Sequence, residues 1–395
     1  MTPVLMPVYG RSEVAPVRGE GPYLFDADGR RWLDFASGIA VNALGHSHPH
    51  LVGAIQRQAA LLMHTSNLYT LPGQQRLAER LTALTFADTV FFTNYGAEAL
   101  EATLKTCLRW LDADGRSEAK VLTFSGAFHG RTLATISATD QPKVRNGFGT
   151  VLERFVTVPF DDLAAAEAAV NAGNVGAILV EPIQGESGIR PTSPAFLQGL
   201  RRLADDHNLL LAFDEVQSGI GRTGTLFAYE QYGVVPDVMA VGKGVGGGFP
   251  LGACLATANA ASGMTAGMHG STYGGNPLAM AAGEAVLDVV AEPAFLAQVR
   301  ETSAILRGRL ETLATEVPGL FLEVRGLGLM LGVKLNGDSR AFVAHARTYG
   351  LLTVAAGDNV VRILPPLIIE PQHIEEAIAK LGEAARTFPR AQAAA

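Results

Sequence analysis

The chain has 395 residues, of which 48% are hydrophobic and only 17% are charged. An average soluble protein carries about 25% charged residues, so exposed surface is scarce here and an oligomer is favoured. The net charge is -7 and no Lys/Arg-rich run occurs, which argues against a nucleic-acid partner. Two cysteines, no signal-peptide pattern and no apolar run of about 18 residues favour a cytoplasmic protein without a membrane span.

The first part of the chain predicts a small β-hairpin followed by two helices. The hairpin strands are expected at 23–25 and 31–35, and the helices from about residue 51 and from 72 to about 82. Short apolar runs then alternate with helical stretches. Most of these runs lack polar alternation, which is typical of strands that helices cover on both faces. The predicted strands are 89–92, 120–124, 176–180, 209–213, 238–241 and 251–255.

The pattern changes after residue 277. Two long helices are predicted at 277–290 and 295–313, followed by strands at 321–324 and 329–333, a helix near 341–349 and a strand at 360–364. The last residues, 391–395, form a low-complexity tail. The whole pattern predicts an α/β fold with a large domain around a mostly parallel sheet and a second, smaller α/β domain. Ligands are expected at the carboxyl ends of the parallel strands.

Three of these strand ends carry candidate functional residues. Asp214 follows a buried run, where a carboxylate either faces a cation or caps a helix. Lys243, between two glycines, is either a nucleophile whose pKa is lowered by desolvation or an ordinary turn lysine. Gly96 leads from a strand into a helix, whose free N–H groups form either a phosphate site or an ordinary βα turn.

Two nucleotide-binding motifs do not fit the glycine-rich segment around the lysine. Its glycines match G-x-G-x-x-G, but a Phe-Pro pair follows in place of a helix, and no acid lies about 20 residues further on. A P-loop is excluded because Asp237 stands in place of its first glycine and Gly244 in place of its Ser or Thr.

Taken together, the three strand ends supply what a pyridoxal phosphate (PLP) enzyme requires: a lysine for the Schiff base, an aspartate for the pyridinium proton and helix N–H groups for the phosphate. The chain resembles the class III aminotransferases of PLP fold type I, and among them most of all the acetylornithine aminotransferases. The resemblance extends from about residue 7 to residue 389. It is carried by segments 33–42, 45–49, 128–132, 181–186, 214–219, 269–277 and by Lys243.

The resemblance implies a large PLP-binding domain at residues 66–285 and a small domain built from residues 1–65 and 286–395. It implies that Lys243 forms the Schiff base and carries the proton, and that Asp214 pairs with the pyridine nitrogen. Thr272 is expected to reach the phosphate of the neighbouring subunit, which implies a homodimer with shared active sites. The other cofactor contacts implied are Gly96, Ala97, Phe128, Glu215, Val216 and Gln217.

The resemblance also implies two arginines that bind carboxylates. Arg131 is expected to bind the α-carboxylate of N-acetylornithine and, in the other half-reaction, the distal carboxylate of glutamate. Arg362 is expected to bind the α-carboxylate of glutamate or 2-oxoglutarate, since a guanidinium pairs bidentately with a carboxylate. Glu186 would neutralise Arg362 when that carboxylate is absent. The alternatives are that Arg362 is an ordinary arginine on the surface of a strand and that Glu186 is an ordinary acid in a loop. Ser271 is a further candidate substrate contact.

No metal site is predicted. His46, His48 and His50 alternate, but no nearby carboxylate completes a ligand set, and the family has a structural turn there. Two residues of the phosphate segment depart from the family pattern: Tyr95 stands where Ser is usual, and Ala97 stands where Ser or Thr is common. Hydroxyl contacts to the phosphate from these positions are therefore in doubt.

The predicted reaction is reversible transfer of the δ-amino group of N2-acetylornithine to 2-oxoglutarate, giving N-acetylglutamate 5-semialdehyde and glutamate, as in arginine biosynthesis. Ile39 stands where ornithine aminotransferases have Tyr, which favours an N-acylated donor. Alternative donors are succinylornithine, succinyl-diaminopimelate, ornithine and 4-aminobutyrate, and an aminomutase is a further alternative. A non-catalytic nucleotide-binding protein is the alternative from another class, but it leaves Asp214 and Arg131 without roles.

Overall fold

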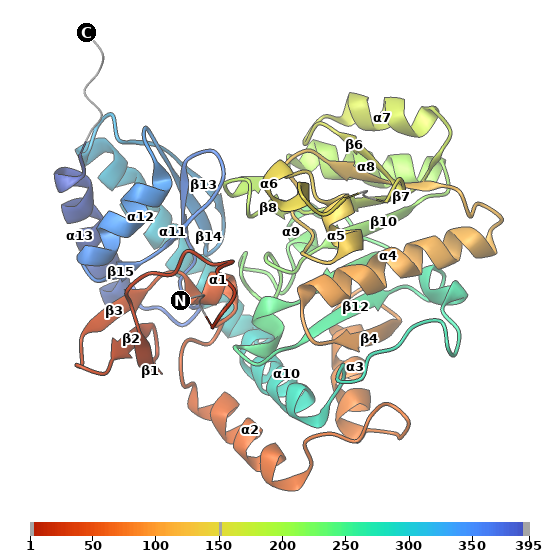
Figure 1. The fold of residues 1–395 in the computed structure, drawn as a ribbon, viewed down its shortest axis with the longest axis horizontal. Helices are drawn as coiled ribbons and strands as arrows, with labels where there is room; N and C mark the ends of the chain where they lie inside the picture. Colours follow the sequence, from red (N-terminus) through yellow and green to blue (C-terminus); the bar gives the residue numbers. More distant parts are fainter. Residues whose placement is uncertain (1–3, 150–151, 390–395) are drawn as a thin grey trace.

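A seven-stranded sheet forms the core of the larger part of the molecule (Figure 1). The computed structural model describes residues 4–149 and 152–389. The strand order is β4-β12-β11-β10-β7-β5-β6, and β12 alone runs antiparallel to its neighbours. The strands are β4 (Thr89–Thr93), β5 (Lys120–Phe124), β6 (Phe155–Val158), β7 (Val175–Val180), β10 (Leu210–Asp214), β11 (Val238–Val241) and β12 (Gly252–Ala256).

Helices cover both faces of this sheet because alternate strand residues point to opposite sides. On β10, Leu210 and Ala212 pack in one apolar cluster with α4 (Gly96–Ala113). Leu211 and Phe213 pack in the other cluster, with α8 (Pro194–Asp206). Helices therefore shield both faces of the central strands from solvent. This confirms the α/β layers and the mostly parallel sheet that the apolar runs predict. The remaining helices of this part are α3 (Pro72–Leu84), α5 (Leu133–Ala138), α6 (Pro142–Arg145), α7 (Leu163–Asn171), α9 (Tyr229–Tyr232) and α10 (Pro277–Val290).

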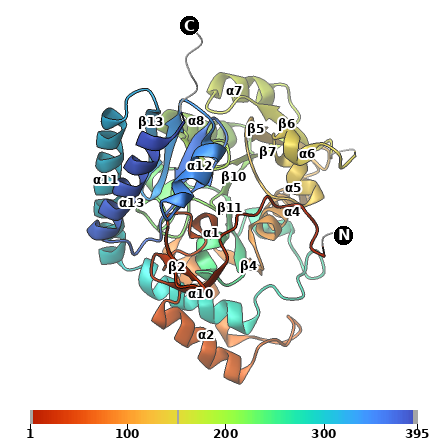
Figure 2. The same ribbon diagram turned by 60° about the vertical axis from the view of Figure 1, so that its left-hand side comes forward.

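The smaller part joins the two ends of the chain. The predicted hairpin, β2 (Tyr23–Asp26) and β3 (Arg31–Asp34), is extended by β1 (Pro16–Glu20) and pairs in parallel with β15 (Leu351–Leu352). A second sheet has the order β13-β14-β17-β16 and carries the long helices on its outside (Figures 1 and 2). Its elements are β13 (Phe321–Leu327), β14 (Met330–Leu335), β16 (Val354–Ala355), β17 (Val360–Ile363), α11 (Pro293–Glu316), α12 (Ser339–Thr348) and α13 (Pro371–Thr387).

The pairing of β3 with β15 supports a small domain made of both chain ends, and the division at residues 65 and 285 stays a prediction. Helix α10 continues across residue 285, and α2 (Pro49–Leu61) packs against it. Every helix within residues 4–149 and 152–389 is too short or too polar to span a bilayer. The low-complexity tail predicted at 391–395 lies outside the described residues.

Candidate active site

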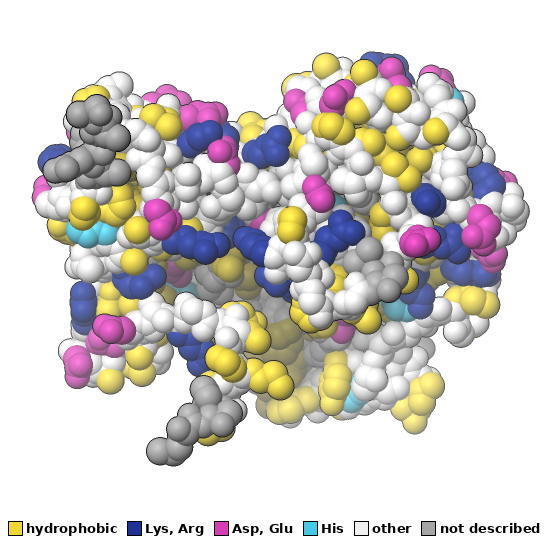
Figure 3. All heavy atoms as spheres, turned by 45° about the horizontal axis from the view of Figure 1, so that its top comes forward, with side chains coloured by type: hydrophobic (Ala, Val, Ile, Leu, Met, Phe, Trp, Pro, Cys, Tyr) yellow, Lys and Arg dark blue, Asp and Glu magenta, His cyan; other side chains and the backbone are white. Residues whose placement is uncertain are grey.

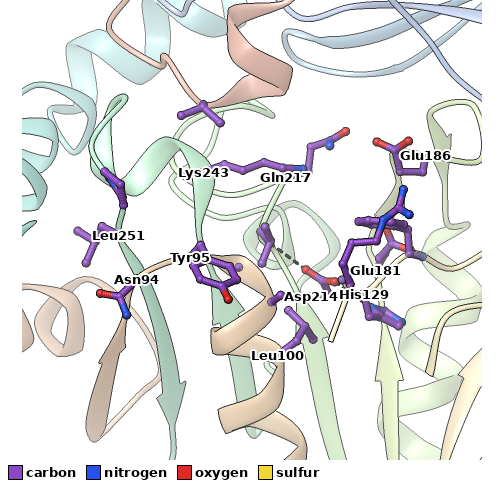
Figure 4. A pocket seen from close by; sticks show the side chains of 18 of the residues that line it. Asn94, Tyr95, Leu100, His129, Glu181, Glu186, Asp214, Gln217, Lys243 and Leu251 are labelled. Atoms are coloured by element: carbon purple, nitrogen blue, oxygen red, sulfur yellow. Dashed lines mark hydrogen bonds and ion pairs between the residues drawn. The ribbon is translucent and has the colours of Figure 1, made fainter. Parts of the chain in front are cut away.

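The carboxyl ends of the central strands open into a cavity of about 470 Å³. The cavity brings together nine of the predicted site residues, from segments spread over 148 positions of the chain (Figure 4). Space-filling atoms show a hollow between the two parts of the molecule with Lys and Arg side chains around it (Figure 3). The nine predicted residues in the lining are Gly96, Ala97, Phe128, Arg131, Glu186, Asp214, Val216, Gln217 and Lys243.

Asp214 lies at the end of β10 and is held by two hydrogen bonds. Its Oδ1 accepts from the backbone N–H of Val216 at 3.0 Å, and its Oδ2 lies 2.8 Å from Nδ1 of the buried His129. Glu181 lies beside them at the end of β7, where one carboxylate oxygen accepts from the backbone N–H of Phe128 at 3.0 Å. Figure 4 shows Asp214, His129 and Glu181 gathered on one side of the cavity.

Burial and mutual attraction set the protonation of this cluster. Burial raises the pKa of the Glu181 carboxyl above its ordinary value, and this effect outweighs the opposing attraction of His129. Burial opposes a charge on His129, but the hydrogen bond to Asp214 and the charges of Asp214 and Glu181 outweigh it and raise the pKa of His129. A protonated imidazole donates through Nδ1, so His129 can donate to Oδ2 of Asp214 and fix the direction of that side chain.

Lys243 begins a short 3-10 turn, η1 (Lys243–Gly246), directly after β11, and its φ of 46° lies in the left-handed region. This strained backbone places the lysine at the cavity wall. Burial lowers its pKa to about 8, and the charge of Arg362 acts in the same direction, whereas Glu186 opposes it. A tenth of the Lys243 side chains is therefore already a neutral amine at about pH 7.

Three segments of the chain, at Gly96, Val216 and Gly242, lie close together where α4 begins. A Cβ on Gly96 would lie 2.6 Å from a methyl group of Val216, and a Cβ on Gly242 would lie 3.0 Å from the Cα of Gly96. Only glycine permits this close approach. Tyr95, the residue before α4, makes no capping hydrogen bond through its side chain, so the first N–H groups of the helix point toward the cavity without a side-chain cap.

Arg362 and Glu186 form an ion pair across the two parts of the molecule. Arg362 lies on β17 of the smaller part, is 2% exposed and places Nη1 2.5 Å from Oε1 of Glu186. Glu186 follows β8 (Ile183–Gln184), which pairs with β9 (Arg190–Pro191). Burial opposes its charge, but Arg362 outweighs that effect and holds the pKa of Glu186 below its ordinary value. The predicted pair is therefore present as two opposite charges.

Arg131 lies at the exposed edge of the cavity. Its guanidinium carbon is 5.5 Å from the ring centroid of Phe128, a cation–π contact. No ion pair to Arg131 occurs within residues 4–149 and 152–389, so its guanidinium is available to an anionic ligand. Arg131 and Arg362 thus differ in that the first is exposed and free of a carboxylate, and the second is buried and paired.

Four predicted site residues lie outside the cavity lining: Arg362, whose ion pair is described above, and Glu215, Ser271 and Thr272. Glu215 is buried and accepts from the backbone N–H groups of Ala228 and Tyr229, which fixes the loop after β10. Ser271 accepts from the backbone N–H of Gly274 at 2.9 Å. Thr272 is exposed, as its predicted contact with a second subunit requires. Their assignments to cofactor or substrate stay predictions.

The histidines near the hairpin have structural contacts. Nε2 of His46 lies 2.8 Å from Oδ2 of Asp34, whose Oδ1 accepts from two backbone N–H groups. His50 pairs with Asp288 at 2.8 Å. The described residues contain no group of three or more His, Cys, Asp or Glu side chains that could hold a metal ion.

His129 and Glu181 are functional candidates to which the sequence assigned no role. Both lie inside segments that carry the family resemblance, 128–132 and 181–186, and this position was the available signal. The contact of His129 with Asp214 joins residues 85 positions apart in the chain. Such a contact follows from the strand order β10-β7-β5, which no local pattern specifies.

Comparison with known proteins identifies the family. Residues 7–385 match the sequence profile of class-III aminotransferases. The chain belongs to the class-III aminotransferase family. It is 55% identical over 390 residues to an acetylornithine aminotransferase of Agrobacterium fabrum, an alignment that covers 98% of each chain. This family consists of transferases that act on amino groups, so the protein is an aminotransferase.

Two solved structures are similar over nearly the whole chain. The N-acetylornithine aminotransferase of Stenotrophomonas maltophilia has a TM-score of 0.85 and 39% identity, with 96% of this chain and 97% of that chain covered. The ornithine aminotransferase of Toxoplasma gondii has a TM-score of 0.91 and 30% identity, with 96% and 92% covered. The fold is therefore common to enzymes with different amine donors, and the donor must be inferred from side chains.

Proposed function

We propose that this aminotransferase moves the δ-amino group of N2-acetylornithine to 2-oxoglutarate, giving N-acetylglutamate 5-semialdehyde and glutamate. The observation that carries the proposal is the pair of arginines around Lys243, one exposed and one neutralised by Glu186. Such a cavity can accept a substrate with one carboxylate and then a substrate with two. The high identity to the Agrobacterium acetylornithine aminotransferase supports this choice of donor.

The cavity fits pyridoxal phosphate as its cofactor. Asp214 is a buried acid whose Oδ2 already contacts His129, and a further cationic partner such as a protonated ring nitrogen would offset the cost of burying its charge. Gly96 and Ala97, at the start of α4, line the cavity, where helix N–H groups without a side-chain cap would bind a phosphate. Phe128 and Val216 line the same cavity and would hold the two ring faces, and Gln217, whose buried Oε1 has no partner in the described chain, would lie near the ring oxygen.

When bound, the cofactor supplies an electron sink that makes a C–H bond next to nitrogen acidic. The chain supplies the proton transfer, since Lys243 is half neutral at about pH 8 and can both accept and return a proton at the cavity wall. His129 fixes the direction of the Asp214 carboxyl through the contact of 2.8 Å between its Nδ1 and Oδ2.

The two arginines would bind the substrates in turn. Arg131 is the expected partner of the single carboxylate of N-acetylornithine, while Arg362 stays paired with Glu186. A dicarboxylate would need both guanidinium groups, and Glu186 would then have to release Arg362. Arg362 is only 2% exposed, so leaving its charge unpaired would cost much free energy. If Glu186 and the substrate carboxylate bind it in turn, Arg362 has a negative partner in both half-reactions.

We also infer a homodimer with shared active sites. Support comes from exposed apolar side chains on the segments before α3 and around Thr272, which would be unfavourable in water and suit an interface. Leu68, Tyr69, Met268 and Tyr273 are 86%, 69%, 42% and 61% exposed. Light scattering should give twice the chain mass, and Thr272→Ala should weaken cofactor binding. A monomeric mass with unchanged cofactor affinity would overturn this inference.

A panel of half-reactions tests the donor. Purified enzyme loaded with pyridoxal phosphate is mixed separately with N2-acetylornithine, N2-succinylornithine, succinyl-diaminopimelate, ornithine and 4-aminobutyrate, and the absorbance change of the cofactor is followed. The largest kcat/KM is expected for N2-acetylornithine. A larger value for any other donor replaces this substrate, and a donor reaction that needs no 2-oxoglutarate for turnover indicates an aminomutase. Colourless protein that binds nucleotide would indicate the non-catalytic alternative.

A further inference from the structure

Arg222 is a buried cation on the loop after β10 that the proposed reaction does not use. Its side chain is 2% exposed, and burial alone lowers the pKa of Arg222 to about 9. None of the carboxylates in residues 4–149 and 152–389 forms an ion pair with it. A buried charge without a counterion is unfavourable, so a protein that keeps one has a use for its hydrogen bonds.

The guanidinium of Arg222 binds the ends of two strands of the smaller part. Its Nη1 donates to the backbone carbonyl of Leu329 at 3.2 Å and to that of Pro365 at 2.5 Å. The backbone carbonyl of Arg222 also accepts from the N–H of Leu329 at 2.9 Å. One residue of the larger part therefore makes three hydrogen bonds to the sheet of the smaller part.

These contacts continue the β14–β17 ladder beyond its last residue pair. The register pairs Gly332 with Arg362 and Leu331 with Ile363, and two more steps place Leu329 opposite Pro365. Proline has no N–H, so the strands cannot form the next backbone hydrogen bond there. The guanidinium supplies the missing donor to the carbonyls on both sides.

The backbones are in direct contact at the same place. A Cβ on Gly328 would lie 2.4 Å from the carbonyl carbon of Thr223 and 2.6 Å from the carbonyl oxygen of Arg222. The φ of Gly328 is +56°, which also favours glycine. The loop and the start of β14 thus meet without an intervening side chain, which leaves little freedom for one to slide past the other.

The loop that ends in this contact begins in the active site. It leaves β10 at Asp214 and places Val216 and Gln217 in the cavity wall before it reaches Arg222. At the other end of the contact, Pro365 lies three positions after Arg362 on the chain. A single short loop therefore connects the wall that faces the proposed cofactor to the strand that carries the buried substrate arginine.

We propose that Arg222 is a positioning residue: it holds the end of β17 against the loop after β10 and thereby fixes where Arg362 meets the carboxylate of a dicarboxylic substrate. This inference rests on the proposed function, because it takes Arg362 as the arginine that binds glutamate and 2-oxoglutarate. It requires that substitution of Arg222 weakens binding in the half-reaction of a dicarboxylate. The half-reaction of a monocarboxylate donor should change little, because the carboxylate of that donor would bind Arg131.

Arg222→Met and Arg222→Lys test this requirement in the loaded enzyme. In Arg222→Met the KM for glutamate and for 2-oxoglutarate should rise about tenfold, with less than about a threefold change in KM for N2-acetylornithine. In Arg222→Lys an ammonium donates from a different position, so the same KM values should rise by an intermediate factor. Calorimetry with glutarate, a dicarboxylate that cannot react, should show the same order of Kd values.

Arg307→Met is the matched control. The Arg307 guanidinium also donates to two backbone carbonyls of the same sheet, those of Val324 and Gly326 on β13, but β13 does not carry Arg362. This variant should leave all KM values within about twofold of the wild type. Thermal unfolding and cofactor content of each variant are measured in parallel, and Arg222→Lys carries the test if Arg222→Met does not fold.

The outcomes separate this role from the proposed function. If wild-type enzyme does not react with N2-acetylornithine, the proposed function fails, and the asymmetry is measured with the donor that does react. If the wild type reacts as proposed but Arg222→Lys and Arg222→Met change both half-reactions equally, or neither, Arg222 serves stability alone and the positioning role is wrong. If the Kd for glutarate rises no more in the Arg222 variants than in Arg307→Met, the positioning role is also wrong.

Discussion

The two ends of the active-site cavity are built on different principles. At the cofactor end, Asp214, His129 and Glu181 come from strand ends of a single sheet, are buried and are hydrogen-bonded to one another or to backbone. At the substrate end, the charged groups come from both parts of the molecule, and one of them, Arg131, is exposed. The first end is fixed before any ligand arrives.

This difference matches the demands on each end. Charge that must be ready throughout the reaction is best preorganised in a buried, fully bonded cluster. Charge that must serve two substrates in turn needs a partner that can leave, and under the proposed function the Glu186–Arg362 pair would have this role. The same protein therefore combines a rigid site with an exchangeable one, and substitutions at the two ends should have different kinetic signatures.

Lys243→Ala should give the largest effect, because it removes both the covalent attachment and the proton transfer. We expect a loss in kcat of at least about 1,000-fold for every donor. The protein should also lose the borohydride-reducible link to the cofactor, as mass spectrometry would show. Lys380→Ala, which removes a lysine bonded to a backbone carbonyl in the smaller part, is the control and should keep full turnover. Retained turnover in Lys243→Ala would disprove the mechanism.

Asp214→Asn should have the next largest effect, since it removes the buried negative charge but keeps the size of the side chain. A loss of roughly 100- to 1,000-fold in kcat is expected in both half-reactions. His129→Asn should lose less, because it leaves the carboxylate in place. A loss confined to one half-reaction, or activity of Asp214→Asn within threefold of the wild type, would contradict the assignment of Asp214 to the cofactor end.

Glu186→Gln should change substrate binding mainly at Arg362. In the wild type, glutamate has to displace Glu186 from Arg362, and a buried charged hydrogen bond contributes about 1.5–3 kcal/mol. Without that competing carboxylate, the KM for glutamate should fall about 10- to 100-fold. The KM for N2-acetylornithine should change by less than about threefold, because the Glu186–Arg362 pair is lost from the free enzyme and from the donor complex alike.

Asp358→Asn is the control for that prediction, because Asp358 pairs with Arg325 and Lys334 at an exposed position. Pairs of this kind contribute little, so its kinetic constants should match the wild type. If Glu186→Gln raises the KM values for both substrates alike, the exchange of partners at Arg362 is wrong.

The fold was largely predictable because its strands are buried on both faces and therefore read as uninterrupted apolar runs. All six predicted strands of the large sheet are present. The strand that was missed, β6, is a partly exposed edge strand of four residues with a polar Thr157, so its pattern differs little from a loop. That β12 runs antiparallel could not be read from its apolar run, since this property depends on pairing with distant strands.

The site was predictable to the extent that it lies at strand ends. Asp214 is the last residue of β10, and Lys243 and Gly96 come shortly after the ends of β11 and β4. The sheet places these three residues in one cavity. The roles of His129, Glu181 and Arg222 were not predictable, because they depend on contacts between segments that only the strand order or the packing of the two parts brings together. The proposed contact of Thr272 with a second subunit would likewise depend on packing that no local sequence pattern describes.

The pH dependence of cofactor attachment sharpens the comparison further, because Lys243 lies between the two ends and feels charges from both. Burial lowers its pKa to about 8, so the neutral amine that attacks the cofactor falls about tenfold for each pH unit below that value. The rate at which cofactor-free protein regains the cofactor absorbance should therefore rise with pH and level off above about 8, where an ordinary lysine would continue to gain until about 10.4.

Glu186 raises the pKa of Lys243, so Glu186→Gln should move the midpoint of this profile to lower pH, and Asp358→Asn should leave it in place. A midpoint near that of an ordinary lysine would mean that water reaches the amine and that the cavity does not desolvate it. If the midpoint of the pH profile is the same in Glu186→Gln as in the wild type, the charge of Glu186 does not affect the pKa of Lys243. The two ends would then be electrically as well as structurally separate.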